Sequence, residues 1–304
     1  MMERKGEYNM NIRNVNESDY ETIQQLDFMT GLRMQWDSAY HKEDEFVSVN
    51  DEGEIIGAAS LFWDGTWYYL NKKDVNLPLY RMQIDVATSK DAPKNTRREL
   101  IRTLQEHFKK YTVEYPNRKL CMRCWCVESD KDYMQELLEE GFYVGGVIMV
   151  FKYDTTRDFE IRKSKENICV EELNNDDESI KAYLVANEAG YGTQDSEDEF
   201  RFMMMGEDTK VFVAKVDGKI VSSTSIWKIE DGRWATENVF TIPEHRRKGI
   251  GREVLYTALK SIQEQKGEVA TLTVVGDNKD AIAMYLSMGY SLMENMMEMH
   301  YILD

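Results

Sequence analysis

Residues 233–262, RWATENVFTIPEHRRKGIGREVLYTALKSI, decide the fold of the second half of the chain. Residues 234–242 are rich in β-branched and aromatic side chains, which predicts a strand. Pro243 ends this strand because proline has no N–H to donate to a sheet. From position 250 onward, apolar residues recur at helical spacing, which predicts a helix. These residues are Ile250, Val254, Leu255, Ala258, Leu259 and Ile262. Gly249 and Gly251 are therefore expected at a strand-to-helix turn.

This turn has the chemistry of an anion site. The first N–H groups of a helix have no partner within the helix, and the helix dipole favours negative charge there. Glycine allows a ligand to approach the backbone closely, and Arg246, Arg247 and Lys248 add positive charge. The stretch therefore predicts a pyrophosphate site, with a solvated basic turn capped by glycine as the alternative.

Two other phosphate motifs fit this turn less well. A dinucleotide-binding fingerprint needs a third glycine, and Val254 stands in that place. A P-loop needs a lysine followed by serine or threonine after its last glycine, which this turn lacks.

The composition limits the classes of partner. The chain has 304 residues and a formal net charge of -17, with 55 acidic residues against 38 Lys and Arg. So acidic a surface argues against non-specific binding to nucleic acid, although a local positive site remains compatible with an anionic ligand. The length favours two domains of about 150 residues.

Targeting and metal signals are weak. We see no apolar run of the roughly 18 to 20 residues that a membrane span needs, and the N-terminal sequence lacks the apolar centre of a signal peptide. We therefore expect a cytoplasmic protein that does not act at membranes.

Cys121, Cys124 and Cys126 lie in a run that predicts a buried strand, with Cys124 and Cys126 on one face. Because no second ligand cluster accompanies them, we expect structural cysteines and no metal.

The two halves of the chain resemble each other faintly, at an offset of about 150 residues. Residues 45–63 and 210–227 each contain two alternating apolar runs joined at Glu-Gly or Asp-Gly, the signal of a hairpin. Residues 97–111 and 251–265 form a second similar pair, with helical spacing. The predicted order in each half is strand, one or two helices, hairpin, central strand, long helix, strand, helix and strand, which indicates a mixed α/β or α+β sheet with flanking helices.

We place the boundary in the polar stretch 154–167, which has no apolar periodicity. The predicted domains are therefore residues 1–158 and 159–304.

A second motif lies in NKDAIAMYLSMGY, residues 278–290. Asn278, Ala281, Tyr285 and Gly289 are spaced by three, four and four residues, which puts them on one stripe of a helix. Gly289 is well placed to end that helix. A tyrosine on such a stripe is most often a core residue, and that alternative stays open for Tyr285.

Together, the two motifs resemble the GNAT superfamily of acetyl-CoA-dependent N-acetyltransferases. The pattern is Arg246-x-x-Gly249-x-Gly251 after a strand, followed by Asn278-x-x-Ala281-x-x-x-Tyr285. The resemblance covers residues 168–304 well and residues 11–153 weakly. It implies two tandem domains, each with a mixed, mostly antiparallel sheet flanked by helices, and acetyl-CoA as co-substrate without a metal.

The resemblance also implies residue roles in the second domain. Backbone amides of the loop would hold the CoA pyrophosphate, and the pantetheine arm would pair with the preceding strand. Tyr285 would protonate the departing thiolate, and Asn278 would contact the pantetheine. The implied cofactor-binding residues are Phe240, Ile242, Arg246, Arg247, Lys248, Gly249, Ile250, Gly251, Arg252 and Asn278.

Acidic residues are candidates for the amine side of the reaction. Glu237, on the central strand, is the candidate base for the attacking amine, and a solvent-facing or salt-bridged strand glutamate is the alternative. Acidic residues near the first two helices favour a cationic acceptor, or else form a solvated helix start. They are Glu188, Asp195, Glu197, Asp198 and Glu199, together with Tyr191.

The first half departs from the family pattern where chemistry would occur. Leu137 stands in the tyrosine position and Asp130 in the asparagine position, while Asn95 and Arg97 replace the two glycines. A leucine has no proton to give to a thiolate. We therefore expect a degenerate, non-catalytic first domain that no longer binds CoA.

The sequence thus predicts an acetyl-CoA-dependent N-acetyltransferase that acts on a primary amine of a small cationic molecule or a peptide. The alternative from another class is a non-catalytic acyl-CoA-binding sensor or assembly protein. A pure binder would need the loop but neither Tyr285 nor Glu237. A protein that binds another nucleotide lacks the expected motifs. We expect a monomer or a homodimer.

Overall fold

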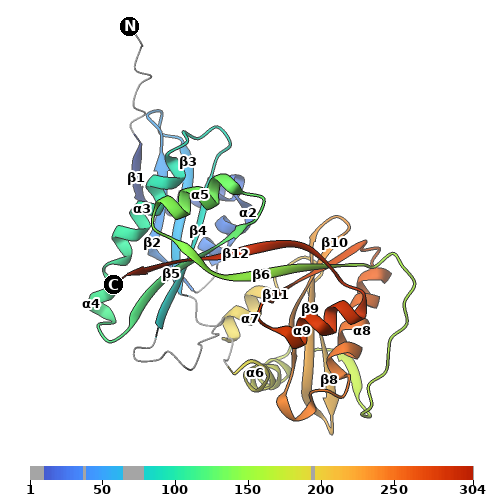
Figure 1. Ribbon diagram of the computed structural model, residues 1–304. Coiled ribbons are helices and arrows are strands. Elements are labelled where there is room, and N and C mark those ends of the chain that lie inside the picture. Colours follow the sequence, from blue (N-terminus) through green and yellow to red (C-terminus); the bar gives the residue numbers. More distant parts are fainter. Residues whose placement is uncertain (1–9, 37–38, 64–78, 193–195, 304) are drawn as a thin grey trace. The chain divides into compact units, whose positions relative to one another are not determined.

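The computed structural model describes residues 10–36, 39–63, 79–192 and 196–303. The chain forms two compact units (Figure 1). Unit 1 comprises Met1–Gly145 together with Met297–Asp304, and unit 2 comprises Gly146–Met296. Each unit is described by itself below.

Unit 1 follows the predicted order of elements as far as its last helix, whereas the strand predicted to complete it, β6 (Tyr143–Asp154), pairs with β11 (Val269–Val275) of unit 2. Its elements are β1 (Asn11–Asn14), η1 (Glu17–Asp19), α1 (Tyr20–Leu26), α2 (Phe28–Trp36), β2 (Tyr40–Val49), β3 (Ile55–Trp63), β4 (Leu79–Thr88), α3 (Thr96–Phe108), α4 (Tyr111–Glu114), β5 (Lys119–Val127) and α5 (Lys131–Glu139). The strands are arranged β1-β2-β3-β4-β5, followed by the C-terminal strand β12 (Ser291–Leu303). Pairing is antiparallel from β1 to β4 and parallel between β4 and β5.

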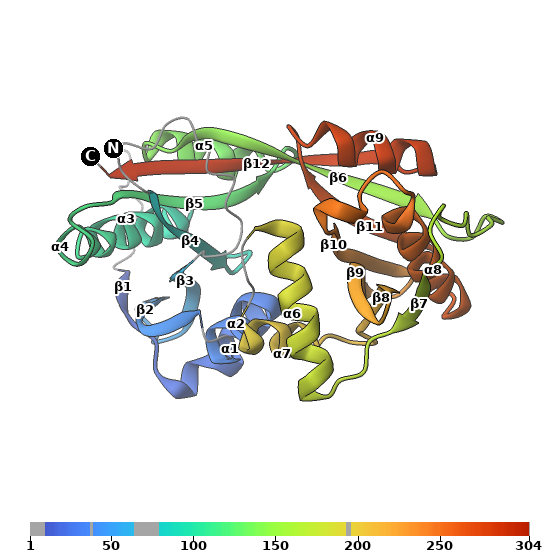
Figure 2. The same ribbon diagram turned by 90° about the horizontal axis from the view of Figure 1, so that it is seen from below.

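Apolar side chains on both faces of the unit 1 sheet explain its layers. Helices α1 and α2 lie on one side of the strands and α3 and α5 on the other (Figure 2). Ile23 and Val47 belong to the core under α1 and α2. Leu100, Leu104 and Leu137 belong to the core under α3 and α5. Buried leucines of this kind each contribute about 1.5–3 kcal/mol of burial free energy.

Unit 2 repeats this order. Its elements are β7 (Cys169–Glu172), α6 (Asp177–Tyr191), α7 (Glu197–Met203), β8 (Lys210–Val216), β9 (Lys219–Glu230), β10 (Arg233–Thr241), η2 (Pro243–His245), α8 (Ile250–Glu264), β11 (Val269–Val275) and α9 (Lys279–Met288). The strands are arranged β6-β11-β10-β9-β8-β7, where β6 is Tyr143–Asp154. Only the β10–β11 pairing is parallel among the described registers of this unit.

The unit 2 sheet also has a helical layer on each face (Figure 1). Val254, Leu255, Leu259 and Ile262 of α8 are buried in the core on one face. Phe240 faces the other core, below α6 and α7, together with Tyr183. The predicted strand and helix of the opening stretch are confirmed as β10 and α8.

Both units contain a strand that comes from a distant part of the sequence. Residues 148–154 of β6 pair antiparallel with residues 269–275 of β11 in unit 2. In unit 1, Glu298 of β12 forms ion pairs with Arg81 at 2.9 Å and Arg123 at 3.1 Å. Compared with a division at residues 158 and 159, unit 1 lacks residues 146–158 and includes residues 297–304. The functional division into a degenerate and a catalytic domain stays a prediction.

Local predictions from turn chemistry are confirmed. The predicted hairpin at Asp217-Gly218 joins β8 to β9, and both turn residues have positive φ, at 50° and 76°. This is the combination that a tight hairpin turn requires. The fold class is confirmed as mixed α and β, with mostly antiparallel sheets flanked by helices.

The cysteine run lies in β5, as predicted. Cys121, Cys124 and Cys126 are buried thiols, and Cys124 and Cys126 share one core. Burial raises the pKa of the Cys124 thiol to about 12. In the described part of the chain, no helix is long and apolar enough to span a membrane.

Candidate functional site

The turn between β10 and α8 has an unusual backbone. Arg247 has a φ of 65° and Gly249 a φ of 89°, so two left-handed residues occur within three positions. Gly249 is the N-cap of α8 and has no side chain to cap it. The chain reaches the helix start through this tight turn, which a residue with a Cβ atom adopts only at a cost.

Gly251 is required by close packing. A Cβ atom at this position would lie 2.9 Å from Thr241 Oγ1, closer than real Cβ contacts. Thr241 Oγ1 is in turn 2.9 Å from Ser222 Oγ, and Ser222 donates to the carbonyl of Phe240 at 2.6 Å. The start of α8 therefore lies directly against the end of β10.

The N–H groups of this turn have no protein acceptor. Within the described residues, none of the backbone N–H groups from Arg247 to Arg252 donates a hydrogen bond to the chain. The first intrahelical bond is that from Glu253 N to the carbonyl of Gly249 at 3.1 Å. Six consecutive N–H groups at a helix start, beside basic side chains, form a cradle for an anion.

Arg246 stabilises the turn through backbone carbonyls. Its Nε donates to the carbonyl of Thr241 and its Nη2 to that of Gly190, both at 2.8 Å. Gly190 lies in the last turn of α6, so the guanidinium connects the end of β10 to this helix. Arg246 thus positions the turn, a role that the sequence alone did not reveal.

The other cations of the turn also have polar partners, which are acidic for Arg247 and Lys248 and a serine hydroxyl for Arg252. Arg247 forms an exposed ion pair with Asp280 at 3.0 Å, and Arg252 donates to Ser287 Oγ at 2.9 Å. Lys248 donates to Glu166 Oε1 at 2.5 Å, while His245 Nδ1 lies 2.8 Å from Glu166 Oε2.

Glu166 comes from the polar stretch that the sequence analysis treated only as a boundary. The hydrogen bonds from Lys248 and His245 lower the pKa of its carboxyl group. The sequence does contain a signal that could have pointed to Glu166, namely an acidic residue directly after the basic residues Arg162, Lys163 and Lys165.

Strands β10 and β11 stop pairing before they end. Their parallel register runs from Arg233↔Val269 to Ala235↔Thr271, whereas β10 continues to Thr241. The sheet is therefore open along the edge of residues 237–241. An extended ligand chain can add to such an edge as another strand.

Phe240 and Ile242, predicted to pair with pantetheine, lie at the end of this opening. The N–H of Ile242 donates to Val221 at 2.9 Å and its carbonyl accepts from His245 at 3.0 Å. The backbone of Ile242 is thus already engaged, which leaves the second lone pair of its carbonyl for a ligand.

Glu237 lies at an irregularity in β10. The register with β9 shifts between Glu237 and Phe240, and Asn238 has a φ of 50°. Glu237 is exposed and pairs in register with Ser225 of β9, which is fully buried. Residues opposite each other in antiparallel strands share a face, so Glu237 is on the face that α6 and α7 cover.

Asn278 and Tyr285 occupy structural positions in α9. Asn278 is the N-cap and accepts a hydrogen bond from Ala281 N at 3.2 Å, which explains the Asn-x-x-Ala spacing. Tyr285 is 5% exposed and packs near Phe151 and Tyr290, with ring centroids 6.4 and 5.6 Å away. Gly289 ends the helix with a φ of 104°, as predicted. Catalytic or binding roles for Asn278 and Tyr285 stay predictions.

A family profile for the acetyltransferase (GNAT) family matches residues 170–290. These residues contain the turn with its free N–H groups, the open strand edge and α9. Residues 170–290 are thus similar to the acetyltransferase (GNAT) family. No curated protein sequence matches the chain.

Solved GNAT structures share the fold of both units. A GCN5-related N-acetyltransferase from Sphaerobacter thermophilus is 13% identical, with a TM-score of 0.66 over 96% of this chain and 95% of that one. A tandem GNAT protein from the clavulanic acid biosynthesis pathway is 15% identical, with a TM-score of 0.66 over 97% and 98%. A putative acetyltransferase from Pyrococcus horikoshii is 11% identical, with a TM-score of 0.60 over 100% and 93%. At these identities the likeness establishes the fold.

The corresponding turn in unit 1 is built differently. From residue 89 to residue 97 no φ is positive. Ala92 N donates to Ser89 and Thr96 N donates to Pro93, so N–H groups are used within the turn, and Pro93 has none. The run of six free N–H groups that unit 2 has before α8 therefore has no counterpart at this turn.

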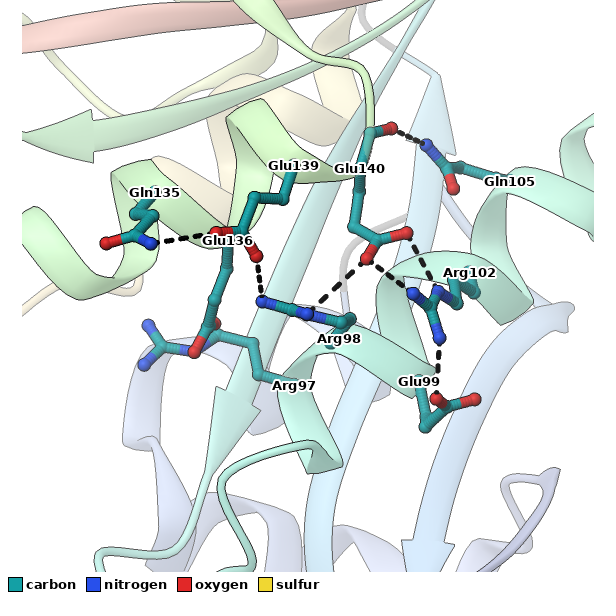
Figure 3. Close-up of polar contacts among 9 residues, drawn as sticks. All are labelled: Arg97, Arg98, Glu99, Arg102, Gln105, Gln135, Glu136, Glu139 and Glu140. Atoms are coloured by element: carbon teal, nitrogen blue, oxygen red, sulfur yellow. Dashed lines mark hydrogen bonds and ion pairs between the residues drawn. The ribbon is translucent and has the colours of Figure 1, made fainter.

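An ion-pair network also joins α3 to α5 in unit 1 (Figure 3). Arg98 contacts Glu139 and Glu140, and Arg102 donates to both oxygens of Glu140 at 2.8 and 2.9 Å. In unit 2 the position of Glu139 is held by Ser287, which makes one hydrogen bond to Arg252. Unit 1 thus connects these two helices by more polar contacts than the single hydrogen bond from Arg252 to Ser287 in unit 2.

The acidic residues around α7 are partly used in the helix start. Glu199 forms a capping box with Ser196, and Glu197 pairs with Arg201 at 2.7 Å. Asp195 lies outside the described residues, whereas Glu188 and Asp198 are exposed. Among the residues that the structure describes, no cluster of three or more His, Cys, Asp or Glu side chains is arranged to hold a metal ion.

Proposed function

We propose that unit 2 transfers an acetyl group from acetyl-CoA to a primary amine of a small cationic acceptor. The observation that carries this proposal is the run of six backbone N–H groups, from Arg247 to Arg252, without a protein acceptor at the β10–α8 turn. The similarity of residues 170–290 to the acetyltransferase (GNAT) family supports acyl transfer as the reaction class.

The residues of this turn fit the pyrophosphate of CoA. The N–H groups supply donors, and the left-handed Gly249 presents the backbone without a side chain. Lys248 supplies positive charge, once its pairing with Glu166 is exchanged for a phosphate. The pantetheine arm would then follow the open edge of residues 237–241, where β10 no longer pairs with β11.

Two side chains would carry the protons of the reaction. The amine attacks the thioester carbonyl, and the C–S bond breaks as the new C–N bond is completed. Glu237 takes the proton that the amine loses, and Tyr285 gives a proton to the departing thiolate. The acetyl group thus ends on the amine, and CoA leaves as the free thiol.

A cationic acceptor suits the negative charge on the face of the sheet that α6 and α7 cover. Glu237 is exposed on the face under α6 and α7, and Glu188 and Asp198 are exposed on those helices. Carboxylates steer a cationic amine by electrostatic attraction.

The competing function is a non-catalytic acyl-CoA-binding protein, and one experiment separates the two. The full chain is incubated with acetyl-CoA and a panel of amines, and release of free thiol is followed. Tyr285→Phe should lower turnover by about 100-fold or more, with acetyl-CoA affinity nearly unchanged.

Tyr290→Phe is the matched control, because it removes a hydroxyl from the same buried aromatic cluster. It should retain turnover. If Tyr285→Phe kept the wild-type rate, Tyr285 would be a core residue only. Thiol release with no amine in a broad panel would favour the binding protein.

A further inference from the structure

Unit 1 contains a cavity of about 230 Å³ that the proposed transferase site does not use. Its walls come from the turn between α1 and α2, from β4, and from β5 and α5. The side chains that matter for its chemistry are Asp27, Thr30, Asp85, Trp125 and Tyr133.

The cavity occupies the opening between two strands. The parallel register of β4 and β5 ends at Gln83↔Arg123, whereas β4 continues to Thr88. Residues 84–88 of β4 line the cavity, together with Trp125 of β5. Unit 1 therefore has the same kind of sheet opening as unit 2, although its turn and helices differ.

Asp85 stands in unit 1 where Glu237 stands in unit 2. Asp85 pairs in register with Ser60 of β3, as Glu237 pairs with Ser225 of β9. Both acids also lie two residues beyond the last parallel pair of their strand. An acidic group is thus retained at the opening of a unit that has Leu137 in place of the candidate catalytic tyrosine.

One oxygen of Asp85 is available for a ligand. Tyr40 donates to Oδ2 at 2.7 Å, and Arg33 lies 3.8 Å from the same oxygen. Within the described chain, Oδ1 accepts no hydrogen bond. Asp85 is 18% exposed at its side chain, so this oxygen is neither fully buried nor fully solvated.

Two further polar groups that line the cavity can form additional hydrogen bonds. Asp27 Oδ1 accepts from Thr30 N at 2.8 Å, and its Oδ2 has no partner in the described chain. The Thr30 residue is only 7% exposed, yet its hydroxyl makes no hydrogen bond within those residues. The hydroxyl oxygen itself is not enclosed by the described residues, so it can form a hydrogen bond with a ligand in the cavity.

The charge of the walls selects a cation. Asp27 and Asp85 line the cavity, and none of the described residues that line it is a lysine or an arginine. Arg33 lies 3.8 Å from Asp85 Oδ2, and its side chain is 39% exposed. An ammonium group with three donors matches two carboxylate oxygens and a hydroxyl.

Aromatic walls select the rest of the ligand. Trp125 is fixed by its hydrogen bond to Gln83 at 3.2 Å and by Arg123, 4.7 Å from its ring centre. Arg97 lies 4.6 Å from the ring centre of Tyr133, and neither arginine lines the cavity. A cavity of about 150 Å³ accommodates benzene, so this larger one accommodates a ring with a short side chain.

We propose that unit 1 binds an arylalkylamine in this cavity. The ammonium group contacts Asp85, Asp27 and the Thr30 hydroxyl, and the ring packs against Trp125 and Tyr133. The site binds without transferring an acyl group, because Leu137 offers no proton. The proposal does not depend on the activity of unit 2.

The test is calorimetric titration of the full chain, without acetyl-CoA, using tyramine as the probe. Tyramine should bind, whereas 4-ethylphenol, which lacks the ammonium group, should bind at least about tenfold more weakly. The anion 3-(4-hydroxyphenyl)propionate should not bind. Equal binding of tyramine and 4-ethylphenol, or no binding of tyramine, would overturn the proposal without touching the transferase proposal.

Three variants locate the site. Asp85→Asn should weaken tyramine at least about tenfold, and the nearly isosteric Thr30→Val should weaken it by a smaller factor. Glu52→Gln, which changes an exposed acid of unit 1 that does not line the cavity, should leave the affinity unchanged. Thermal melts identify any variant that fails to fold. If Asp85→Asn and Thr30→Val bound tyramine as tightly as the wild type, tyramine would bind outside this cavity and the proposal would be wrong.

Discussion

Glu166 accepts a hydrogen bond from Lys248 Nζ at 2.5 Å, and through its other oxygen it contacts His245. A residue of the polar stretch before β7 thus compensates the positive charge of the turn that begins α8. Lys165 N also donates to the carbonyl of Lys248 at 3.0 Å, so this contact includes the backbone. Any polyanion that binds the turn must compete with the Glu166 carboxylate.

Glu166→Gln should therefore increase the affinity for CoA. The variant removes a negative charge beside the turn and frees Lys248, and an exposed pair of this kind changes affinity by about two- to fivefold. The gain should be larger at low salt. The measurement is a CoA titration at two ionic strengths, with Glu244→Gln, an exposed acid of the same turn, as the charge control. A weaker affinity would show that Glu166 holds the turn in its binding conformation.

Gly249→Val should abolish the thermal stabilisation that CoA confers. Valine resists the φ of 89° at this position, so the turn must change and its N–H groups would no longer converge. Gly218→Val is the matched control, because Gly218 has a φ of 76° in an open hairpin turn. Both variants should lower the Tm, but only Gly249→Val should lose the shift with CoA. An unchanged shift would contradict the assignment of the turn.

A calorimetric titration should give one CoA per chain. The turn before α3 uses its N–H groups internally, and Arg98 and Arg102 bridge α3 to α5. In unit 1 the donors at Ala92 and Thr96 are used and Pro93 has none, so the run of six free N–H groups on which the pyrophosphate site of unit 2 is built is interrupted. A stoichiometry of two would show that the first copy retains CoA binding.

Glu45 should make the stability of the protein dependent on pH. Its carboxyl group is fully buried in β2, and burial raises its pKa from 4.5 to about 7, although Tyr20 donates a hydrogen bond. Between these values the folded state binds more protons than the unfolded state, so stability falls as the pH rises. The cost above pH 7 is about 3 kcal/mol. Glu45→Gln should therefore raise the Tm by several degrees at pH 8, at about 2–4 °C per kcal/mol, and by much less at pH 5.

Glu298→Gln is the control of opposite sign. Burial works against this carboxylate, but hydrogen bonding from His300 and the charge of Arg123 lower its pKa to about 2. Its stabilisation is present above pH 4.5 and is lost as the pH falls toward 2. Thermal melts at pH 8 should show Glu298→Gln below the wild type and Glu45→Gln above it. If the difference in Tm between Glu45→Gln and the wild type were the same at pH 5 and at pH 8, the raised pKa of Glu45 would be contradicted.

The elements of each unit could be predicted because their signals are local. The strand before Pro243, the helix from Ile250 and the helix end at Gly289 follow from propensity, periodicity and capping. The chemistry of the turn could also be anticipated, since glycine and basic residues occur together there.

The partners of the side chains could not be predicted in the same way. Arg246 donates to two backbone carbonyls, one of them Gly190, 56 positions earlier, and sequence spacing does not encode such a contact. Asn278 shows a second limit of prediction from sequence motifs. Its spacing to Ala281 is explained by helix capping, so the motif alone does not separate a structural role from a ligand contact.

The residues that complete unit 1 are also the last of the described chain to be synthesised. Glu298, which neutralises the buried Arg123, reaches the ribosome exit only after every residue of unit 2. Domains generally fold in order as they emerge, but the first unit of this chain is complete only once residues 297–304 have emerged. Until then its sheet lacks β12, and Arg123 lacks its ion pair with Glu298. Expression of residues 1–158 alone would leave the first unit permanently in that unfinished state.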